Sequence, residues 1–117
     1  MTIQELSNMT DTELNTLAAK CMGWTYSMGR WMTSDGALTE WVLWSPSTCL
    51  DHAFELQDKA CERDDEGYIQ ALAQAVQNGK RSKNQQRSAM CTPVDFITAT
   101  ARQRCIAALA VLSTLGL

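Results

Sequence analysis

The chain has 117 residues, of which 45% are hydrophobic and 20% are charged, and its formal net charge is −3. These values are typical of a single globular domain and exclude a disordered or fibrous protein. No apolar run approaches the roughly 18 residues that a membrane-spanning helix needs, and the first residues lack the basic and then apolar pattern of a signal peptide. We therefore expect one domain over residues 1–117, in the cytoplasm and not bound to a membrane.

The five cysteines fit a reducing compartment. Their number is odd and they are scattered along the chain, unlike the paired cysteines of a small disulfide-rich secreted protein. A free cysteine is often a small buried hydrophobe, and this is the role that we expect for Cys21, Cys49, Cys61, Cys91 and Cys105.

The first predicted element is a helix over about residues 11–22. Thr10 and Glu13 form a capping box, in which each side chain can satisfy a free backbone N–H group at the start of a helix. Apolar residues then repeat at helical spacing up to Gly23, which favours the left-handed backbone that ends many helices. A similar cap near the start of the chain predicts a loosely ordered turn within residues 1–9.

Short strands are predicted next, because residues that favour strands are dense between Trp24 and Trp44. Two turn signals divide this stretch, Ser27-Met28-Gly29 and Ser34-Asp35-Gly36. The pattern predicts antiparallel strands near residues 24–27, 30–33 and 39–44.

Helices are predicted for most of the remaining chain. A Ser-Pro-Ser-Thr sequence can cap a helix over residues 48–63, and the acidic run that follows is typical of a solvated junction. Helical spacing of apolar residues recurs over 67–77, where a strand is the alternative for the first residues. It recurs again over 101–114, directly after a capping box of Thr100 and Gln103. Residues 79–91 are polar and basic and are predicted to form an exposed loop. Together the elements predict an α+β fold, with a small antiparallel sheet packed by about four helices in a single layered, sandwich-like domain.

Two parts of the sequence resemble one known family. The first comprises residues 17–24, which read Leu-Ala-Ala-Lys-Cys-Met-Gly-Trp, residues 44–48, which read Trp-Ser-Pro-Ser-Thr, and residues 53–56 of the following helix, which read Ala-Phe-Glu-Leu. The second is the alanine-rich segment 100–109. In this order they resemble the phage ABA sandwich domain, a family of small bacteriophage and prophage proteins, whereas the middle of the chain departs from the family pattern. The resemblance implies a phage accessory protein in the host cytoplasm and no particular chemistry.

A catalytic or metal site is not expected. His52 is the single histidine, and Cys49 precedes it at a spacing that can bind zinc, but tetrahedral zinc needs four ligands and no second pair is present in the sequence. A Cys–His nucleophile pair on one helix also lacks a third group to orient it. We therefore expect no enzymatic activity, no metal and no cofactor.

Basic residues are concentrated at the predicted loop, and they are Lys80, Arg81, Lys83 and Arg87. They can form an anion site for phosphate groups or for an acidic protein surface, or they can belong to an ordinary solvated loop. Binding of bulk duplex nucleic acid is not expected of an acidic protein with so short a basic run.

Tryptophan provides a second set of candidate binding residues. Trp31, Trp41 and Trp44 can stack on a base or anchor a protein interface where their rings are exposed. Alternation along the last strand places Trp41 and Trp44 on opposite faces of the sheet. A role in the core is the alternative for Trp24 and for one of Trp41 and Trp44.

These features lead to two hypotheses on function. The first is a non-catalytic inhibitor of host defence machinery that acts by binding a host protein. The alternative is a protein that sequesters a signalling nucleotide, with an indole on the base and the basic run on the phosphates. A structural or regulatory phage protein is a further alternative.

The charge of the chain is divided between its two parts. Residues 1–79 carry four basic and twelve acidic side chains, for a net charge of −8, and residues 80–117 carry six and one, for a net charge of +5. Such a division can orient a partner or pair two copies of the chain head to tail. Alternatively, the two parts neutralise each other within one copy.

Overall fold

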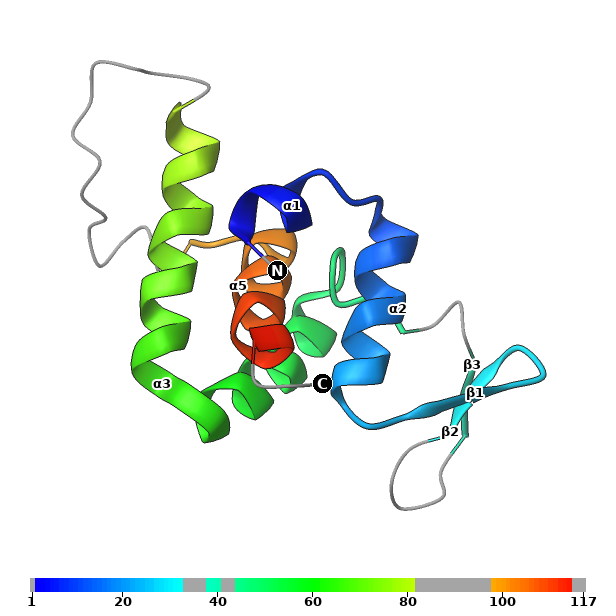
Figure 1. The fold of residues 1–117 in the computed structure, drawn as a ribbon. Coiled ribbons are helices and arrows are strands. Elements are labelled where there is room, and N and C mark those ends of the chain that lie inside the picture. The colour runs from blue at the N-terminus through cyan, green and yellow to red at the C-terminus, as the bar shows by residue number, and fades with distance from the viewer. Residues whose placement is uncertain (1, 33–37, 41–43, 82–97, 115–117) are drawn as a thin grey trace.

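The predicted α+β class is confirmed by the computed structural model, which describes residues 2–32, 38–40, 44–81 and 98–114. Helices form the body of the molecule and short strands lie beside it (Figure 1). Within the described ranges, no helix is both long and apolar enough to cross a membrane. The helices are α1 (Ile3–Ser7), α2 (Asp11–Cys21), α3 (Leu50–Arg81) and α5 (Ala101–Thr114), and the strands are β1 (Thr25–Ser27), β2 (Arg30–Met32) and β3 (Leu38–Glu40).

Capping boxes fix the starts of two predicted helices. Thr10 Oγ1 accepts a hydrogen bond from the N–H of Glu13 (3.2 Å), and Glu13 Oε1 accepts one from the N–H of Thr10 (3.0 Å). Thr100 and Gln103 exchange equivalent hydrogen bonds of 3.1 and 2.8 Å. α2 and α5 begin directly after these caps, so the predicted helical ranges are confirmed apart from the last residue of the first.

The N-terminal residues are more ordered than the loose turn predicted within residues 1–9. Thr2 and Glu5 form a third capping box, which starts the short helix α1. Ile3 and Leu6 of this helix are buried in the core. The sequence pattern did not reveal the helix, because two apolar residues are too few to establish a period.

α3 joins the two helices predicted over residues 48–63 and 67–77, and the helical alternative is confirmed for the second. The combined helix is bent at Asp64, whose φ of −163° and ψ of 89° are not helical. The Asp64 carboxylate accepts a hydrogen bond from the N–H of Gly67 (3.0 Å) and so caps the second half of α3. A Cβ atom at Gly67 would collide with this carboxylate, so glycine lets the cap close over the helix end.

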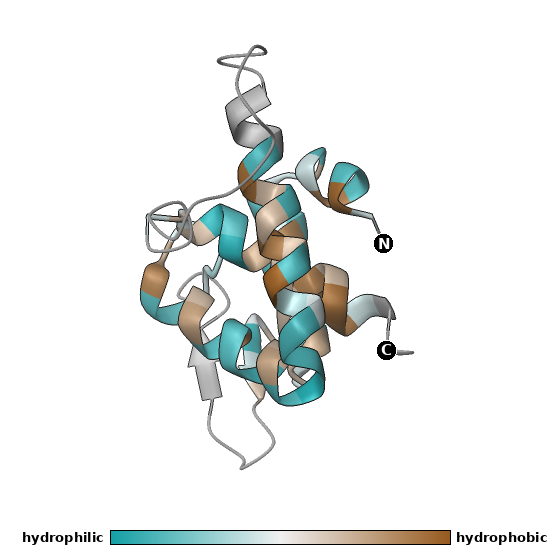
Figure 2. Cartoon of the chain, turned by 90° about the vertical axis from the view of Figure 1, so that its left-hand side faces the viewer, coloured by the Kyte–Doolittle hydropathy of each residue, from teal (hydrophilic) through white to brown (hydrophobic). Residues whose placement is uncertain are grey.

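The second half of α3 is longer than its predicted range. The helix continues through Gly79 to Arg81, so the loop predicted over residues 79–91 does not begin where the glycine suggested. Residues 82–91 of that loop lie outside the described ranges. Figure 2 shows that the bend is hydrophilic, and residues 62–66 are all exposed, which confirms the solvated junction predicted there.

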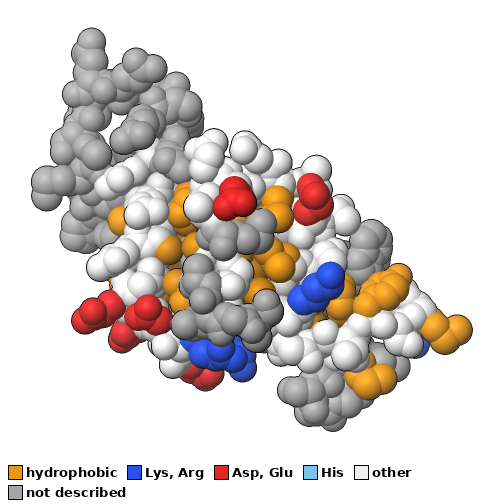
Figure 3. Space-filling view, in the orientation of Figure 1, with side chains coloured by type: hydrophobic (Ala, Val, Ile, Leu, Met, Phe, Trp, Pro, Cys, Tyr) orange, Lys and Arg blue, Asp and Glu red, His pale blue; other side chains and the backbone are white. Residues whose placement is uncertain are grey.

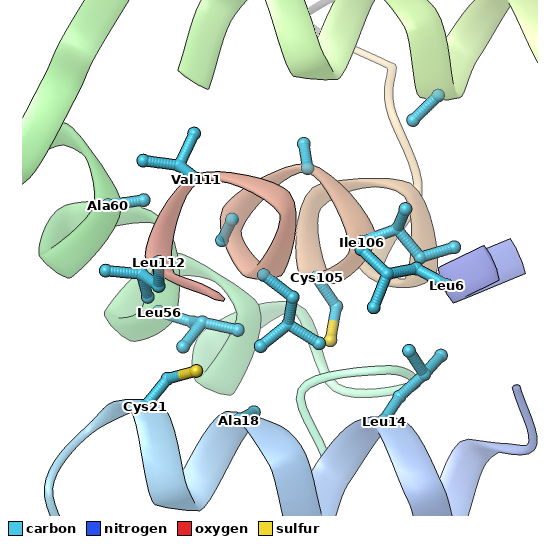
Figure 4. Close-up of a cluster of buried hydrophobic side chains, with 14 of the residues drawn as sticks. Leu6, Leu14, Ala18, Cys21, Leu56, Ala60, Cys105, Ile106, Val111 and Leu112 are labelled. Carbon is cyan, nitrogen blue, oxygen red and sulfur yellow. The ribbon is translucent and has the colours of Figure 1, made fainter. Parts of the chain in front are cut away.

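α5 forms the centre of the helical body and is buried on nearly all sides. Side chains of the other helices, among them Leu6, Leu14 and Leu56, meet around it (Figure 4). Ala107 and Ala108 of α5 are fully buried, and their small side chains let neighbouring helices approach closely. Most of the surface of α5 is therefore buried against the rest of the molecule.

The three strands form an antiparallel sheet in the order β1–β2–β3. The strands predicted near residues 24–27 and 30–33 are confirmed. The third is observed at 38–40, and residues 41–43 of its predicted range lie outside the described ranges. The sheet lies beside α2 and not between layers of helices (Figure 1). Among the described side chains of β1 and β2, Trp31 is the one that belongs to the core cluster, and its indole joins the hairpin to the core.

Candidate functional site

The hairpin of β1 and β2 presents an apolar side chain at its tip. Met28 and Gly29 form the two-residue turn, with φ of 51° and 81°, which are values typical of a type I′ turn. Such turns favour Asn-Gly, because most side chains are strained at positive φ. The Met28 side chain is nevertheless 96% exposed, so packing within the molecule does not compensate for this backbone conformation.

Apolar side chains also lie on both faces of the hairpin. Tyr26 is opposite Trp31 in the strand register, and their rings meet edge to face with centroids 5.3 Å apart. Trp31 is buried, whereas Tyr26 is 58% exposed. Met32 follows Trp31 in the alternation of the strand and therefore lies on the opposite face, where it is 42% exposed. Figure 3 shows hydrophobic side chains gathered at this end of the molecule.

Two of the three candidate tryptophans, Trp31 and Trp44, are not part of an exposed stacking platform. Trp31 and Trp44 are each 2% exposed and belong to the core cluster. For Trp44 this agrees with the alternative role in the core. Trp24 packs on Trp44, with ring centroids 4.5 Å apart. Trp41 lies outside the described residues. The two buried indoles thus remove apolar surface from water and stabilise the fold.

A hydrogen-bonded cluster around Trp44 joins α2 to the start of α3. The indole N–H donates to the Asn15 carbonyl (3.1 Å), and the ring stacks on His52 with centroids 5.1 Å apart. His52 Nδ1 accepts a hydrogen bond from the N–H of Ser45 (3.0 Å), so a neutral ring carries its proton on Nε2. Asn15 Oδ1 accepts from the N–H of Ser47 (3.0 Å). His52 and Asn15 therefore hold the turn at Ser45 and Ser47 in place. No sequence motif had indicated this role for Asn15.

The four basic candidate residues are only partly described. Lys80 and Arg81 lie in the last turn of α3, whereas Lys83 and Arg87 lie outside the described ranges. The anion site thus stays a prediction. A nucleotide site that combines these basic residues with a stacked indole is not supported by Trp31 or Trp44, because both rings are buried.

A buried polar cluster links α5 to both halves of α3. Arg104, which is 8% exposed, donates from Nη1 to Gln57 Oε1 (2.8 Å) and from Nε to the Ala99 carbonyl (3.2 Å). Tyr68, beyond the bend, donates to the same Gln57 oxygen (2.7 Å). Burial raises the pKa of this phenol, although the nearby guanidinium opposes the shift. The sequence did not reveal this cluster, because arginine in a helix is usually solvated.

An open groove of about 390 Å³ lies at the bend of α3. Its apolar part comes from Ile69, which is exposed, and from the half-buried Cys61. Its polar part includes the carboxylates of Asp65 and Glu66. Among the described residues, no lysine or arginine forms an ion pair with either carboxylate. The residues that line the groove are Cys61, Asp65, Glu66, Ile69 and Gln70.

Burial raises the pKa of three thiols. The pKa of Cys105 is raised to about 12, and that of Cys21 is also raised, in both cases mainly by desolvation. The pKa of Cys61 is raised by desolvation and then by the carboxylates of Asp58 and Asp65. Because the thiolate is the reactive form, these thiols are weak nucleophiles at neutral pH. In the parts of the chain that the structure describes, no three His, Cys, Asp or Glu side chains lie close enough together to hold a metal ion.

The sequence matches no family model and no curated protein, and the structure matches no solved structure. The resemblance to the phage ABA sandwich domain therefore stays a prediction made from residues 17–24, 44–48, 53–56 and 100–109. The candidate site is accordingly defined by its geometry, and that geometry centres on the hairpin.

Proposed function

We propose that this protein is a non-catalytic binding protein that inserts its β1–β2 hairpin into an apolar cleft of a partner protein. The observation that carries the proposal is Met28, which is 96% exposed at the tip with a positive φ. Tyr26 and Met32 extend the apolar surface behind the tip, one on each face. A projection of this shape can bury all three side chains at once only inside a concave surface.

The backbone at Met28 supports a role in binding. A left-handed conformation costs a residue with a side chain about 1–2 kcal/mol, and strained residues of this kind tend to occur at functional sites. Full burial of a methionine side chain contributes about 1.5–3 kcal/mol, which is enough to offset the strain. Since folding leaves the side chain in water, contact with a partner accounts for a methionine at this position.

The base of the hairpin supports the same role. Trp31 anchors β2 in the core, and its edge-to-face contact with Tyr26 fixes β1 beside it. A two-residue turn leaves the tip little freedom. A hairpin held in this way loses little conformational entropy when it binds, which favours affinity.

In its specific form, the proposal is a phage- or prophage-encoded inhibitor of host defence machinery, which acts in the host cytoplasm by covering an interface of a host protein. The sequence resemblance supports this form. A non-catalytic role is supported by His52, whose Nδ1 is engaged by Ser45, and by the raised pKa values of three thiols.

Sequestration of a nucleotide is the weaker proposal. It needs an accessible indole beside the basic run, and Trp31 and Trp44 are buried. A thermal-unfolding scan against linear and cyclic nucleotides tests it, because a ligand at 100 times its Kd adds roughly 2.7 kcal/mol of stability. An upward shift of the midpoint with one nucleotide class would favour sequestration over the hairpin account.

The hairpin account is tested by capture from a bacterial lysate. The variant Tyr26→Ser/Met28→Asn/Met32→Thr removes the apolar tip and both flanks, and the control Leu50→Gln removes an exposed apolar side chain of α3. We expect a host protein that is captured in stoichiometric amounts by the wild type and the control but not by the hairpin variant. Capture that is equal for all three proteins, or no captured protein at all, would contradict the proposal.

A further inference from the structure

The thioether at the tip of the hairpin is open to oxidants. Met28 is 96% exposed and Met32 is 42% exposed, whereas Met9 and Met22 are half-buried and pack against the core cluster. We propose that Met28 is a site of reversible oxidation, at which hydrogen peroxide forms methionine sulfoxide and so switches off binding by the hairpin. This proposal rests on the hairpin function proposed above and concerns its regulation.

The reaction needs only the thioether and the peroxide. The sulfur of Met28 uses a lone pair to form a bond to one peroxide oxygen, the O–O bond breaks, and the second oxygen leaves as water after proton transfer. The sulfur is thereby oxidised by two electrons, and the peroxide is reduced by two. Methionine sulfoxide reductases, supplied with a thiol reductant, remove the oxygen as water and restore the thioether.

A sulfoxide at the tip opposes binding to an apolar cleft. Oxidation converts a flexible apolar side chain into a polar one, and burial of a polar group without a hydrogen bond is unfavourable. The modification therefore removes the stabilisation from burying the Met28 side chain and adds a desolvation penalty. Together the two effects should raise the Kd for the partner roughly ten- to hundredfold.

The same oxidation should leave the fold unchanged. A side chain that is 96% exposed makes few contacts that an added oxygen can disrupt. The space at the tip is also open, since a Cβ atom at Gly29 would meet nothing within 4 Å apart from its neighbours in the chain. Met9 and Met22 differ, because a sulfoxide at either would disturb contacts with the core. Oxidation of Met28 thus separates loss of binding from loss of stability.

The backbone at Met28 distinguishes a switch from a simple scavenger of oxidants. A scavenging methionine needs exposure alone, and any unstrained surface position provides it. Met28 instead has a φ of 51°, a conformation that disfavours most residues with a side chain. Tyr26 and Met32 continue the apolar surface behind it. The oxidised sulfur therefore lies within the proposed contact surface, where a change in polarity alters binding.

The first test uses the isolated protein and needs no partner. Brief treatment with dilute hydrogen peroxide is stopped with catalase, and the protein is digested with trypsin. Cleavage after Lys20 and Arg30 yields a peptide that contains both Met22 and Met28, so fragment masses compare the two sulfurs within one peptide. We expect Met28 to be oxidised several-fold faster than Met22, with an unchanged far-UV circular dichroism spectrum. Oxidation of Met28 that is no faster than that of Met22 would overturn the proposal.

The second test measures the Kd of the host protein that the untreated wild type captures, purified and titrated by calorimetry. Oxidation confined to Met28 should raise this Kd, and sulfoxide reductases with a thiol reductant should restore it. The matched control is Met28→Leu, compared only with itself before and after peroxide. Leucine cannot form a sulfoxide, whereas the other methionines of this variant still can, so its Kd should not change on treatment.

The possible outcomes separate the switch from the hairpin function. An untreated wild type that captures no host protein would overturn both proposals. A Kd that does not change on oxidation of Met28, a rise that the reductases do not reverse, or an equal rise for Met28→Leu would overturn the switch and leave the hairpin function in place.

Discussion

Arg104 and Phe54 form a cation–π contact between α5 and α3, with the guanidinium carbon 5.0 Å from the centroid of the ring. The same guanidinium donates to Gln57, whose side-chain oxygen also accepts from Tyr68 beyond the bend. Arg104 thus contacts the first half of α3 directly, and it shares the acceptor Gln57 with Tyr68 of the second half. This cluster therefore joins the two halves of α3 across the bend.

Replacement of Arg104 should therefore be costly. Arg104→Met keeps much of the apolar length of the side chain but leaves the Ala99 carbonyl without this donor and Gln57 with one donor fewer. We expect a loss of about 2–3 kcal/mol in the free energy of unfolding, measured in urea. Tyr68→Phe removes one neutral hydrogen bond and should cost about 1 kcal/mol. Equal losses for the two variants would contradict the central role of the cation.

Arg102 should stabilise the fold mainly through backbone carbonyl groups. Its Nη2 donates to the carbonyl groups of Met9 (2.6 Å) and Ser7 (3.3 Å), and its Nη1 forms an ion pair with Asp11 (2.7 Å) near the surface. We expect Arg102→Ala to lower the free energy of unfolding by about 1–2 kcal/mol and Asp11→Asn to lower it by less than about 0.5 kcal/mol. Urea titrations of both variants measure the two losses. A larger loss for Asp11→Asn would show that the ion pair contributes more to stability than the hydrogen bonds to the backbone carbonyl groups.

Two of the three capping boxes should make stability depend on pH. Hydrogen bonds from the backbone and side chain of the partnering threonine lower the pKa of Glu5 and of Glu13 from the ordinary value of 4.5. The stabilisation from a lowered carboxyl pKa is present above the unfolded value and is lost as the pH falls through the folded value. The midpoint of thermal unfolding should therefore decrease as the pH falls below about 4.5.

Glutamine substitution isolates this effect. Glu5→Gln/Glu13→Gln retains side chains that can form the capping box but removes both titrating groups. The double variant should show a shallower loss of thermal stability between neutral and acidic pH than the wild type. Identical pH profiles would show that these carboxyl groups do not control acid stability. The third box uses Gln103 and should not titrate.

The groove can be probed through the reactivity of Cys61. The carboxylate of Asp65 contributes to the raised pKa of this thiol, so Asp65→Asn should lower the pKa and increase the thiolate fraction at mildly basic pH. We expect faster alkylation of Cys61, followed by mass spectrometry of its peptide. Cys105 serves as the internal control, because its pKa of about 12 should keep it unreactive in the folded protein. An unchanged Cys61 rate would show that Asp65 does not lie against the groove as described.

The sequence was sufficient to predict the elements whose signals are local. The capping boxes at Thr10 and Thr100 marked the starts of α2 and α5, and helical spacing identified both halves of α3. Gly79 misled the prediction of a helix end, because a glycine inside a helix costs only about 1 kcal/mol and neighbouring contacts can offset that. The joining of the two helices through Asp64 was not predicted, since one non-helical residue leaves no periodic signal.

The candidate site was harder to predict, because exposure is a tertiary property. Trp31 and Trp44 were chosen for their chemistry, yet the fold buries both. Met28 was noticed only as part of a turn, although a bulky residue before the glycine of a two-residue turn is itself a signal of strain. Arg104 carried no local signal, because its partners on α3 are far away in sequence.

The central claim is that Met28 serves binding at a cost to folding, and the variant Met28→Asn tests it most directly. Asparagine tolerates positive φ, so the variant should be more stable by about 1 kcal/mol in urea unfolding. The same change removes the apolar tip, so the Kd for the captured partner, measured by calorimetry, should rise roughly ten- to hundredfold. Higher stability together with weaker binding is the result that we expect. Higher stability with unchanged affinity would contradict the account, because the exposed methionine would then not be the anchor of the hairpin.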